Sequence, residues 1–360
     1  MTNSFPSPVI GAVGRALPEH RYSADALSTA LAEEWGGSEH ERARFARIHR
    51  SAGVRSRHLA LPMEEYRKLR SFAAANEAWT RVGAELSGRA VEAALMRAGL
   101  APEDVDHVLF NTVTGIATPS IDVKLINRLG MRSDLKRTPM FGLGCVGGAA
   151  GLARAADYLR GFPDDVALLV SVELCSLTLQ LHDRSTANLI ATALFGDGAA
   201  AVVLAGGARA GALARPGPRV VASRSLFFHD TEELMGWEIA DTGFQVVLTA
   251  GIPDLIRARL RDAVDAFLTA EGLSRTAIRH WIAHTGGPKV LRAIEGALEL
   301  PPDALARSWQ SLAAVGNLSS ASVLFVAADL LDAGVAVPDE YGVVLSMGPG
   351  FCGELVLVQW

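Results

Sequence analysis

Cys145 is the residue whose type and setting most clearly indicate chemistry. The small residues Val146-Gly-Gly-Ala-Ala150 follow it and lead into a helical pattern. A thiol at a helix N-terminus lies near unpaired N–H groups and the positive end of the helix dipole, which favour the thiolate. The other interpretation is a small, inert core cysteine packed beside glycines. The choice depends on the partners that the rest of the chain brings to Cys145.

An internal repeat supplies two such partners. The run Arg279–His284 aligns with Asp106–Asn111, and the run that begins at Gly316-Asn317 aligns with the run that begins at Gly144-Cys145. Asn317 therefore stands at a helix start equivalent to that of Cys145. His284 ends a predicted strand, at the sheet edge where ligand sites of α/β folds gather. If the halves pack about a pseudo-two-fold axis, Cys145, His284 and Asn317 converge.

A Cys–His–Asn cluster is suited to acyl transfer through a thioester. His284 would pair with the Cys145 thiolate and lower the pKa of the thiol. The His284 N–H and the Asn317 amide would stabilise the oxyanion of a tetrahedral intermediate, or the enolate left when a malonyl thioester loses carbon dioxide. This chemistry needs no metal. As alternatives, a strand-end histidine can be structural, and an asparagine after glycine can serve as a helix N-cap.

The elements that position these residues alternate between strands and helices, which predicts an α/β fold. A segment rich in Gly, Ala and Pro, 206–217, is interpreted as a linker, so we expect one half in residues 1–212 and the other in 213–360. The predicted strands are Val9–Gly14, Val105–Thr112, Met140–Gly144, Val166–Glu173, Ala199–Leu204 and one near Arg279–His284; the predicted helices cover 24–50, 72–99, 146–160, 186–194 and 254–272.

The composition excludes several functional classes. The chain has 360 residues, 49% of them hydrophobic, and its net charge of −5 argues against a general nucleic-acid binder. Six arginines nevertheless gather between Arg42 and Arg57. They are interpreted either as a solvated helix face or as a phosphate-binding patch for a small polyanion such as a coenzyme.

The cysteine count and the polarity of the chain favour a reducing cytoplasm. The three cysteines are an odd number without metal-ligand spacing, and Met1–Pro8 lacks the pattern of a signal peptide. The longest uncharged run, Ser308–Ala328, contains Gln310, Asn317 and several serines. It is interpreted as a buried strand, turn and helix, and not as a membrane span.

Four motifs resemble those of the type III polyketide synthases, the chalcone-synthase-like branch of the thiolase superfamily, and the resemblance extends from Val9 to Trp360. It implies a thiolase fold, which is a duplicated five-layered αβαβα arrangement, and a homodimer. The four motifs are Gly144-Cys-Val-Gly-Gly148, Leu194-Phe-Gly-Asp-Gly-Ala-Ala-Ala201, Trp281-Ile-Ala-His-Thr-Gly-Gly-Pro288 and Gly316-Asn-Leu-Ser-Ser-Ala-Ser-Val-Leu-Phe325.

The resemblance also implies roles for the site residues. Cys145 matches the nucleophile that carries the starter and the growing chain, and His284 and Asn317 match the pair that decarboxylates malonyl-CoA. Phe195 and Phe244 match the two gatekeeper phenylalanines, although each could be plain core. The substrates implied are malonyl-CoA and an acyl starter on coenzyme A or an acyl carrier protein, with no further cofactor.

The entrance for coenzyme A is expected at basic residues. Arg44 and Arg47 match the family positions that hold the coenzyme A phosphates. Lys289, which follows Gly286-Gly287-Pro288, would add to the same entrance; this is an inference from its position and not a family rule.

Cavity residues bear on the product. By the resemblance, Cys175, Thr178 and Ser319 line the elongation cavity. Some bacterial naphthalene-forming members have a second cysteine where Thr178 stands, which argues against that product. The segment around Trp237, Met235-Gly-Trp, resembles bacterial members that form alkylresorcinols and alkylpyrones from fatty acyl starters. A resorcinol or pyrone is therefore expected. Ser346-Met-Gly-Pro-Gly350 departs from the plant pattern and argues against flavonoid products.

Three other functions are weighed against this one. A β-ketoacyl-ACP synthase of the initiation type would share the three residues, but its histidine stands in a His-Gln-Ala-Asn run, unlike His284-Thr-Gly-Gly. A protein that only binds acyl thioesters, without catalysis, would not need the complete set of Cys145, His284 and Asn317. A cysteine hydrolase would leave Phe195 and Arg47 without a role.

Overall fold

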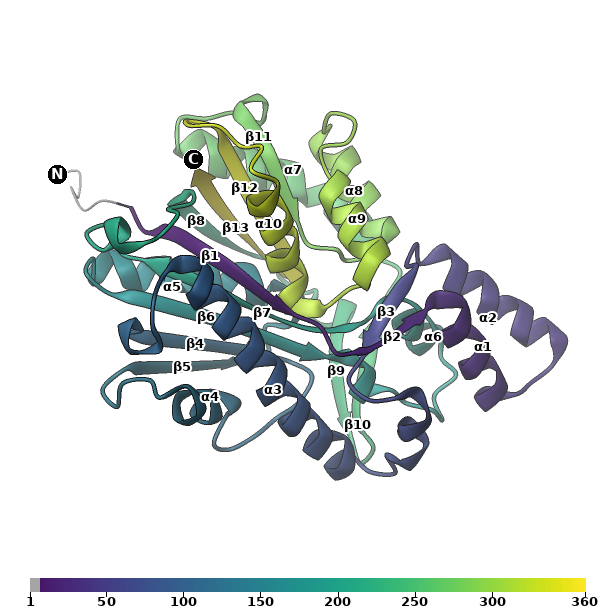
Figure 1. Cartoon of the computed structure of the whole chain (residues 1–360). Helices are drawn as coiled ribbons and strands as arrows, with labels where there is room; N and C mark the ends of the chain where they lie inside the picture. The colour runs from purple at the N-terminus through teal and green to yellow at the C-terminus, as the bar shows by residue number, and fades with distance from the viewer. Residues whose placement is uncertain (1–6) are drawn as a thin grey trace.

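One nine-stranded sheet with helices on both faces organises the computed structural model, which describes residues 7–360 (Figure 1). Its strands follow the order β11-β12-β13-β8-β1-β7-β6-β4-β5, and it divides into two halves between β8 and β1, which in the described chain pair only at Val9 and Arg219. The strands are β1 (Val9–Ala16), β4 (His107–Thr112), β5 (Lys136–Phe141), β6 (Val166–Leu174), β7 (Asp197–Ala205), β8 (Arg219–Phe227), β11 (Ile278–Ala283), β12 (Tyr341–Gly348) and β13 (Cys352–Gln359).

The first outer layer consists of α3 (Phe72–Ala98) and α4 (Ile121–Leu129). Buried residues of α3 pack against alternate residues of β1, β6 and β7. Gly14 allows α3 to lie directly on β1, because a Cβ at this position would lie 2.1 Å from the Ala90 carbonyl oxygen. The predicted helix of residues 72–99 is confirmed, and Gly99 caps it in the left-handed conformation.

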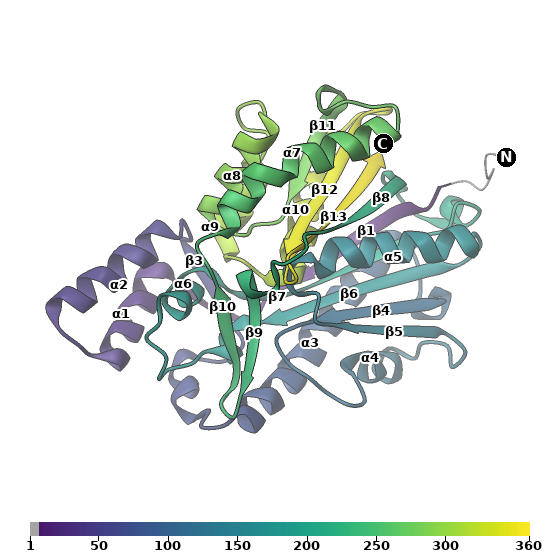
Figure 2. The ribbon, with the colours of Figure 1, turned by 180° about the vertical axis from the view of Figure 1, so that it is seen from behind.

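The middle layer contains the two helices that the repeat predicted to be equivalent. They are α5 (Gly147–Gly161) and α10 (Ser322–Ala333), and they lie between the two halves of the sheet (Figure 2). Each is preceded by a short 3-10 turn, Gly144–Val146 before α5 and Ser319–Ala321 before α10. The internal repeat therefore positions Cys145 and Asn317 at two neighbouring helix starts in the centre of the molecule.

The second outer layer covers the other face of the β8-β13-β12-β11 half of the sheet. It consists of α7 (Ile252–Ala270) and α8 (Pro288–Leu298), with α9 (Ala306–Val315) beside α8. The prediction of a strand at the start of the uncharged run was wrong, because α9 is a helix. Its buried face includes Ser308 and Ser311, and the Ser308 hydroxyl donates to the Ala283 carbonyl. Because serines occupy part of the buried face, the sequence of α9 lacks the helical spacing of apolar residues.

The edge strand β5 also differs from its prediction. The apolar signal placed a strand at Met140–Gly144, whereas the strand spans Lys136–Phe141. Its first residues are polar and exposed, since β5 lies at the sheet edge and pairs only with β4 among the described strands. Exposed edge residues carry no periodic apolar pattern. No helix among residues 7–360 is long and apolar enough to cross a membrane.

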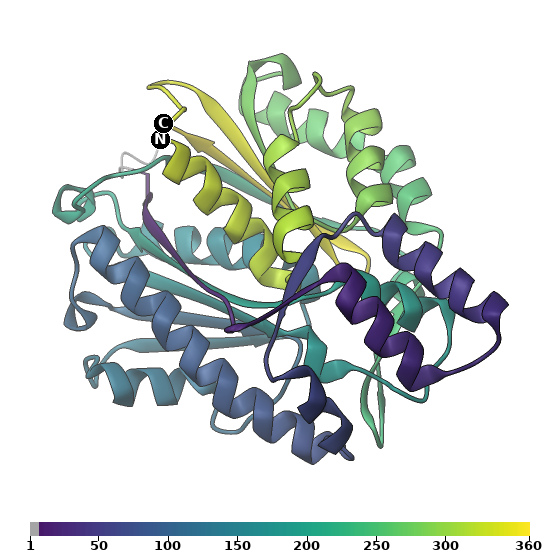
Figure 3. The same cartoon turned by 45° about the vertical axis from the view of Figure 1, so that its right-hand side comes forward.

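A group of shorter elements extends from one end of the layers (Figure 3). The predicted helical region 24–50 forms two helices, and the predicted helix 186–194 is confirmed as α6. The elements are α1 (Ala24–Trp35), α2 (Glu39–Ser51), α6 (Thr186–Leu194), the strand pair β2 (His20–Ser23) and β3 (Ser56–Leu59), the hairpin β9 (Met235–Ala240) and β10 (Gly243–Leu248), and the 3-10 turns Met63–Lys68 and Cys175–Thr178.

His49 joins α2 to α6 and makes stability depend on pH. Its ring packs on Phe45 with a centroid separation of 4.0 Å and faces the Thr192 hydroxyl. Burial, with a smaller contribution from the Arg57 cation, lowers the pKa of His49 from 6.5 to about 3. The folded state therefore binds this proton more weakly than the unfolded state does. Stability contributed by neutral His49 is complete above pH 6.5 and is lost as the pH falls toward 3.

We therefore predict that His49→Gln removes part of the acid destabilisation. Between pH 7 and pH 5 the free energy of unfolding of the wild type should fall by about 2 kcal/mol more than that of the variant. Urea unfolding at the two pH values measures this difference. The contributions of all other titratable groups are the same in both proteins and cancel when the two are compared. Parallel pH dependence in the two proteins would show that folding does not shift the pKa of His49, which contradicts the prediction.

Candidate active site

The turn before α5 holds Cys145 in a buried position. The Cys145 side chain is 5% exposed. Gly144 has φ +53°, and a Cβ there would lie 2.5 Å from Pro349 Cδ. Both the left-handed backbone and the contact with the β12–β13 turn therefore require glycine at this position.

Two further glycines bring the start of α5 against its neighbours. A Cβ on Gly147 would lie 2.4 Å from Asn111 Nδ2, and one on Gly148 would lie 2.2 Å from the Ser320 carbonyl oxygen. The second approach presses α5 onto the turn that begins α10. It is the backbone contact that brings Cys145 close to Asn317.

Asn317 is oriented so that its amide donates toward Cys145. Its Oδ1 accepts the Ser319 N–H at 2.8 Å and the Ser322 hydroxyl at 3.2 Å. The Nδ2 group is left as a donor, and the hydrogen bonds of the thiol with Ser319 and Asn317 act to lower the pKa of Cys145. Cys145 Sγ lies 3.7 Å from Ser319 Oγ. Ser319 has a left-handed φ of +48°, which is unfavourable for a residue with a Cβ and is typical of functional sites.

His284 follows β11 and lies beside the same strand as Cys145. Its backbone N–H donates to the Leu345 carbonyl at 2.9 Å, and the Ser346 hydroxyl donates to the Cys145 carbonyl at 2.9 Å. Two successive residues of β12 thus hold the histidine and the cysteine. His284 is 5% exposed, and its Nδ1 has no hydrogen-bond partner among the described residues.

Burial keeps both Cys145 and His284 neutral. It raises the pKa of the Cys145 thiol to about 12, although the hydrogen bonds of the thiol with Ser319 and Asn317 oppose this rise. It also lowers the pKa of His284 to about 3. The predicted thiolate–imidazolium pair with a lowered thiol pKa was wrong for this structure. The desolvation of both groups outweighs the helix dipole. The neutral imidazole is left as a proton acceptor.

Glu173 is a buried carboxylate that the sequence argument passed over. It accepts the Val113 N–H at 3.1 Å and the Thr114 hydroxyl at 2.8 Å, and Ser320 Oγ also donates to it. Burial raises its pKa to about 7. Glu173 thereby ties β4 and β6 to the turn that carries Ser319. An acidic residue inside the otherwise apolar strand of residues 166–174 was the available signal.

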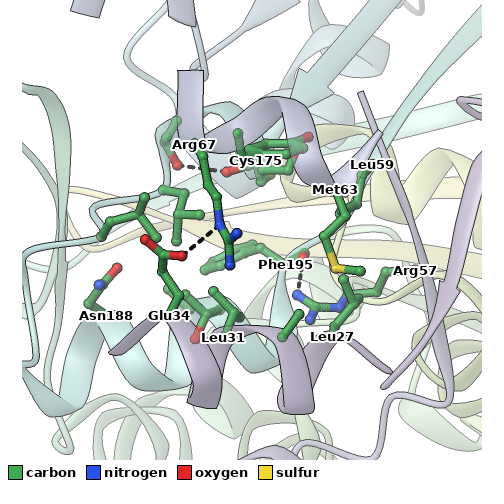
Figure 4. A pocket seen from close by; sticks show the side chains of 18 of the residues that line it. Leu27, Leu31, Glu34, Arg57, Leu59, Met63, Arg67, Cys175, Asn188 and Phe195 are labelled. Carbon is green, nitrogen blue, oxygen red and sulfur yellow. Dashed lines mark hydrogen bonds and ion pairs between the residues drawn. The ribbon is translucent and has the colours of Figure 1, made fainter. Parts of the chain in front are cut away.

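A cavity of about 330 Å³ has Phe195 in its wall, whereas Asn317 does not line it (Figure 4). The Asn317 N–H donates to the Leu194 carbonyl at 2.8 Å, and the Gly196 N–H donates to the Asn317 carbonyl at 2.9 Å. Phe195 is thus held directly against Asn317. Cys145 and His284 do not line this cavity. The lining comes from α1, β3, the Met63–Lys68 turn, α6 and β9, and it includes the predicted residues Phe195, Cys175, Thr178 and Trp237.

Two predicted cavity residues lie elsewhere. Phe244 is buried behind Trp237, with ring centroids 5.9 Å apart, and meets Phe72 edge to face at 5.3 Å. Ser319 lies beside the Cys145 sulfur and does not line the cavity. The sequence could not separate the cavity wall from the layer behind it.

The predicted basic entrance is on the surface. Arg44, Arg47 and Lys289 are exposed, and none of them lines the cavity. Arg44 donates to the Thr186 hydroxyl at 2.7 Å. The end of α2 meets the start of α8, where a Cβ on Gly53 would lie 3.4 Å from Pro288 Cγ.

The Gly286-Gly287 pair links His284 to this entrance. Gly287 is buried with φ +113°, a conformation that favours glycine, and it immediately precedes α8. The segment from His284 to Lys289 therefore runs from the centre of the molecule to the surface beside α2 within six residues.

A buried cysteine and an oriented asparagine at paired helix starts, within a duplicated αβαβα fold, define a condensing enzyme of the thiolase type. The family model of the N-terminal domain of chalcone and stilbene synthases matches residues 4–208, and that of the C-terminal domain matches residues 219–360. The chain belongs to this family, the type III polyketide synthases, and is an acyltransferase. The division at residue 212 stays a prediction.

Relatives that match nearly the whole chain agree with this assignment. The chain is 53% identical to the 1,3,6,8-tetrahydroxynaphthalene synthase of Streptomyces peucetius subsp. caesius, over 98% of this chain and 93% of the relative. It is 35% identical to a putative chalcone synthase of Bacillus subtilis, over 97% of each. The crystal structure of the tetrahydroxynaphthalene synthase of Streptomyces coelicolor A3(2) superposes with a TM-score of 0.92 at 28% identity, covering 98% of this chain and 99% of the other.

Proposed function

We propose that the chain uses malonyl-CoA both as starter and as extender and releases a polyhydroxylated naphthalene. The site supports the condensing chemistry, since the buried Cys145 thiol lies beside Ser319 and its pKa is affected by a hydrogen bond with the Asn317 side chain. A cavity that has Phe195 in its wall could receive the growing chain. The 53% identity to a tetrahydroxynaphthalene synthase supports the product. This similarity runs against the expectation drawn from Thr178, which stands where some naphthalene-forming relatives have cysteine.

Loading of the starter would begin at the neutral thiol. The Cys145 sulfur attacks the carbonyl carbon of the thioester while His284 accepts the thiol proton. The Asn317 amide and a His284 N–H donate to the oxyanion that forms. When the intermediate collapses, the bond from carbon to the coenzyme A sulfur breaks, and this sulfur takes the proton from His284. The acyl group is left as a thioester on Cys145.

Extension would use the same donors. When malonyl-CoA loses carbon dioxide, the electron pair of the broken carbon–carbon bond forms an enolate, whose oxygen is held by Asn317 and His284. The enolate carbon attacks the thioester on Cys145 and expels the thiolate, so the chain grows by two carbons. The ten ring carbons of a naphthalene correspond to five two-carbon units. No cofactor beyond the coenzyme A thioesters is needed.

The surface entrance would bind the coenzyme A part of the substrate, and the cavity would hold the acyl chain. Arg44, Arg47 and Lys289 would hold the coenzyme A phosphates at the surface, because guanidinium groups suit phosphate oxygens. The chain would pass the Gly286-Gly287 segment and grow into the cavity behind Phe195.

A fatty acyl starter with a resorcinol or pyrone product is the second candidate. It is favoured by the aliphatic side chains that α1 contributes to the cavity wall, including Leu27 and Leu31. The starter could come from coenzyme A or from an acyl carrier protein.

We further propose that the chain forms a homodimer through the β5 edge. Among the described residues, Phe141 at the end of β5 and Ile116 in the loop that follows β4 are each 50% exposed. Large apolar side chains at an unpaired sheet edge are typical of a surface that another chain covers. Light scattering of the purified protein should give twice the mass of the chain. A monomer at all concentrations would contradict this.

Incubation with malonyl-CoA alone tests the proposed product. We expect a ten-carbon aromatic product, identified by mass and by its spectrum. The same incubation with octanoyl-CoA added should leave this product dominant. If malonyl-CoA alone gives no product and octanoyl-CoA restores turnover, the fatty acyl starter is correct. A single condensation onto an acyl carrier protein would show instead an initiating ketoacyl synthase.

A further inference from the structure

Arg57 places a buried cation in the wall of the cavity. It is one of the six arginines that the sequence grouped as a basic patch, yet it is 4% exposed and lines the cavity. Figure 4 shows its guanidinium turned toward the middle of the cavity. The functional roles assigned above leave this residue unused.

The guanidinium of Arg57 is only partly satisfied by its surroundings. Nη1 donates to the Phe195 carbonyl at 2.8 Å, whereas Nε has no partner among the described residues. Asp197 attracts Arg57 but forms no ion pair with it among residues 7–360. The Asp197 carboxylate is instead engaged by the Ala60 N–H at 2.6 Å, the Ser176 N–H at 2.8 Å and the Ser176 hydroxyl.

Arg57 nevertheless remains charged. Burial lowers its pKa to about 10, which leaves the guanidinium protonated at neutral pH. A buried charge without an ionic partner is costly, whereas an anion that enters the cavity would find donors already in place.

The position of Arg57 relates it to the acyl group on Cys145. Its Cγ lies 3.2 Å from the point that a Cβ on Gly316 would occupy, so its stem packs against the residue before Asn317. Its head is bonded to Phe195, which is held against Asn317. An acyl group that extends from Cys145 past Phe195 would therefore meet the guanidinium.

The other charged side chains that line the cavity are not buried, so none of them offers a buried cation as Arg57 does. Glu34 and Arg67 pair with each other at 2.7 Å, with side chains 32% and 64% exposed. Glu33 and Glu64 also line the cavity and are not buried. These residues belong to the rim, and Arg57 is the buried cation of the wall.

We propose that Arg57 binds the terminal carboxylate of a dicarboxylic acyl group inside the cavity. The site thereby selects starters such as malonyl over neutral acyl groups of the same length. The inference rests on the proposed function, because it assumes that the starter is carried on Cys145. A carboxylate in the cavity would accept a hydrogen bond from Nη2, for which the described residues supply no partner.

Acylation of Cys145 by succinyl-CoA and butyryl-CoA tests this selection. The two acyl groups have the same number of carbons and differ in a carboxylate against a methyl group, and the succinyl carboxylate cannot be lost by β-decarboxylation. Intact-protein mass spectrometry follows the rate of the adduct without any extender. We expect the wild type to load succinyl at least about tenfold faster. Arg57→Met should lose this preference and keep its butyryl rate, and Arg57→Lys should keep part of the preference.

Arg67→Met is the matched control, because it removes a cation from the rim of the same cavity and should leave the preference unchanged. Thermal unfolding shows whether each variant folds. If Arg57→Met does not fold, the loading rates of the wild type alone still test the inference, since equal rates for the succinyl and butyryl groups overturn it. If Cys145 takes up neither group nor malonyl, the proposed function itself fails.

Discussion

Cys145→Ala is expected to lower product formation from malonyl-CoA by at least about a thousandfold. Without the sulfur, no thioester can form on the enzyme, although the Asn317 and His284 donors remain in place. The variant should still fold, because the alanine side chain is smaller and Cys145 Sγ makes only a weak contact with Ser319, at 3.7 Å. Product formation and thermal unfolding measure the two effects separately.

Cys175→Ala is the matched control for this prediction. Cys175 is also buried, and it lines the cavity. Burial and the nearby carboxylates Glu173 and Asp197 hold its pKa well above the usual range. Unlike Cys145, Cys175 does not stand at the start of α5 beside the Asn317 turn. The variant should keep activity within about tenfold of the wild type. If Cys145→Ala stays active while Cys175→Ala does not, the nucleophile is assigned to the wrong cysteine.

Gly148→Ala is expected to have the second largest effect. The added Cβ would lie 2.2 Å from the Ser320 carbonyl oxygen and 3.0 Å from Val323 Cγ1. A backbone atom cannot move aside as a flexible side chain can, so the start of α5 must shift away from the Asn317 turn. We expect a loss of about 1–3 kcal/mol in stability. Activity should fall by about a hundredfold, since the shift separates Cys145 from Asn317.

Gly161→Ala provides the control within the same helix. Gly161 is the last residue of α5, and a Cβ there meets no atom within 4 Å. The variant should be as stable as the wild type or slightly more stable, with unchanged activity. Urea unfolding and the turnover of malonyl-CoA measure both variants. Equal behaviour of the two alanine variants would show that close approach of α5 is not what positions Cys145.

The repeat explains why the centre of the fold could be predicted from the sequence. Matching runs around Cys145 and Asn317 predicted equivalent helix starts, and the structure confirms the five layers with α5 and α10 in the middle. The glycines around Cys145 carried the same information, because only residues without side chains allow these helices to approach closely.

Other features depend on distant contacts that no local pattern encodes. Arg57 looked like its exposed neighbours, and only the packing of β3 against α9 and β7, together with the contact of its stem with Gly316, reveals its burial. The pKa of Cys145 was misjudged because desolvation depends on the whole surrounding shell. The cavity wall from α1 likewise arises from tertiary packing of residues that read as an ordinary amphipathic helix.

The central claim is that Cys145 carries the acyl chain, and peptide mapping tests it most directly. The protein is incubated with malonyl-CoA, quenched in acid, digested, and analysed by mass spectrometry for acyl adducts on its three cysteines. We predict an adduct on the peptide with Cys145, and unmodified Cys175 and Cys352. An adduct confined to Cys175, or turnover without any adduct, would contradict the account.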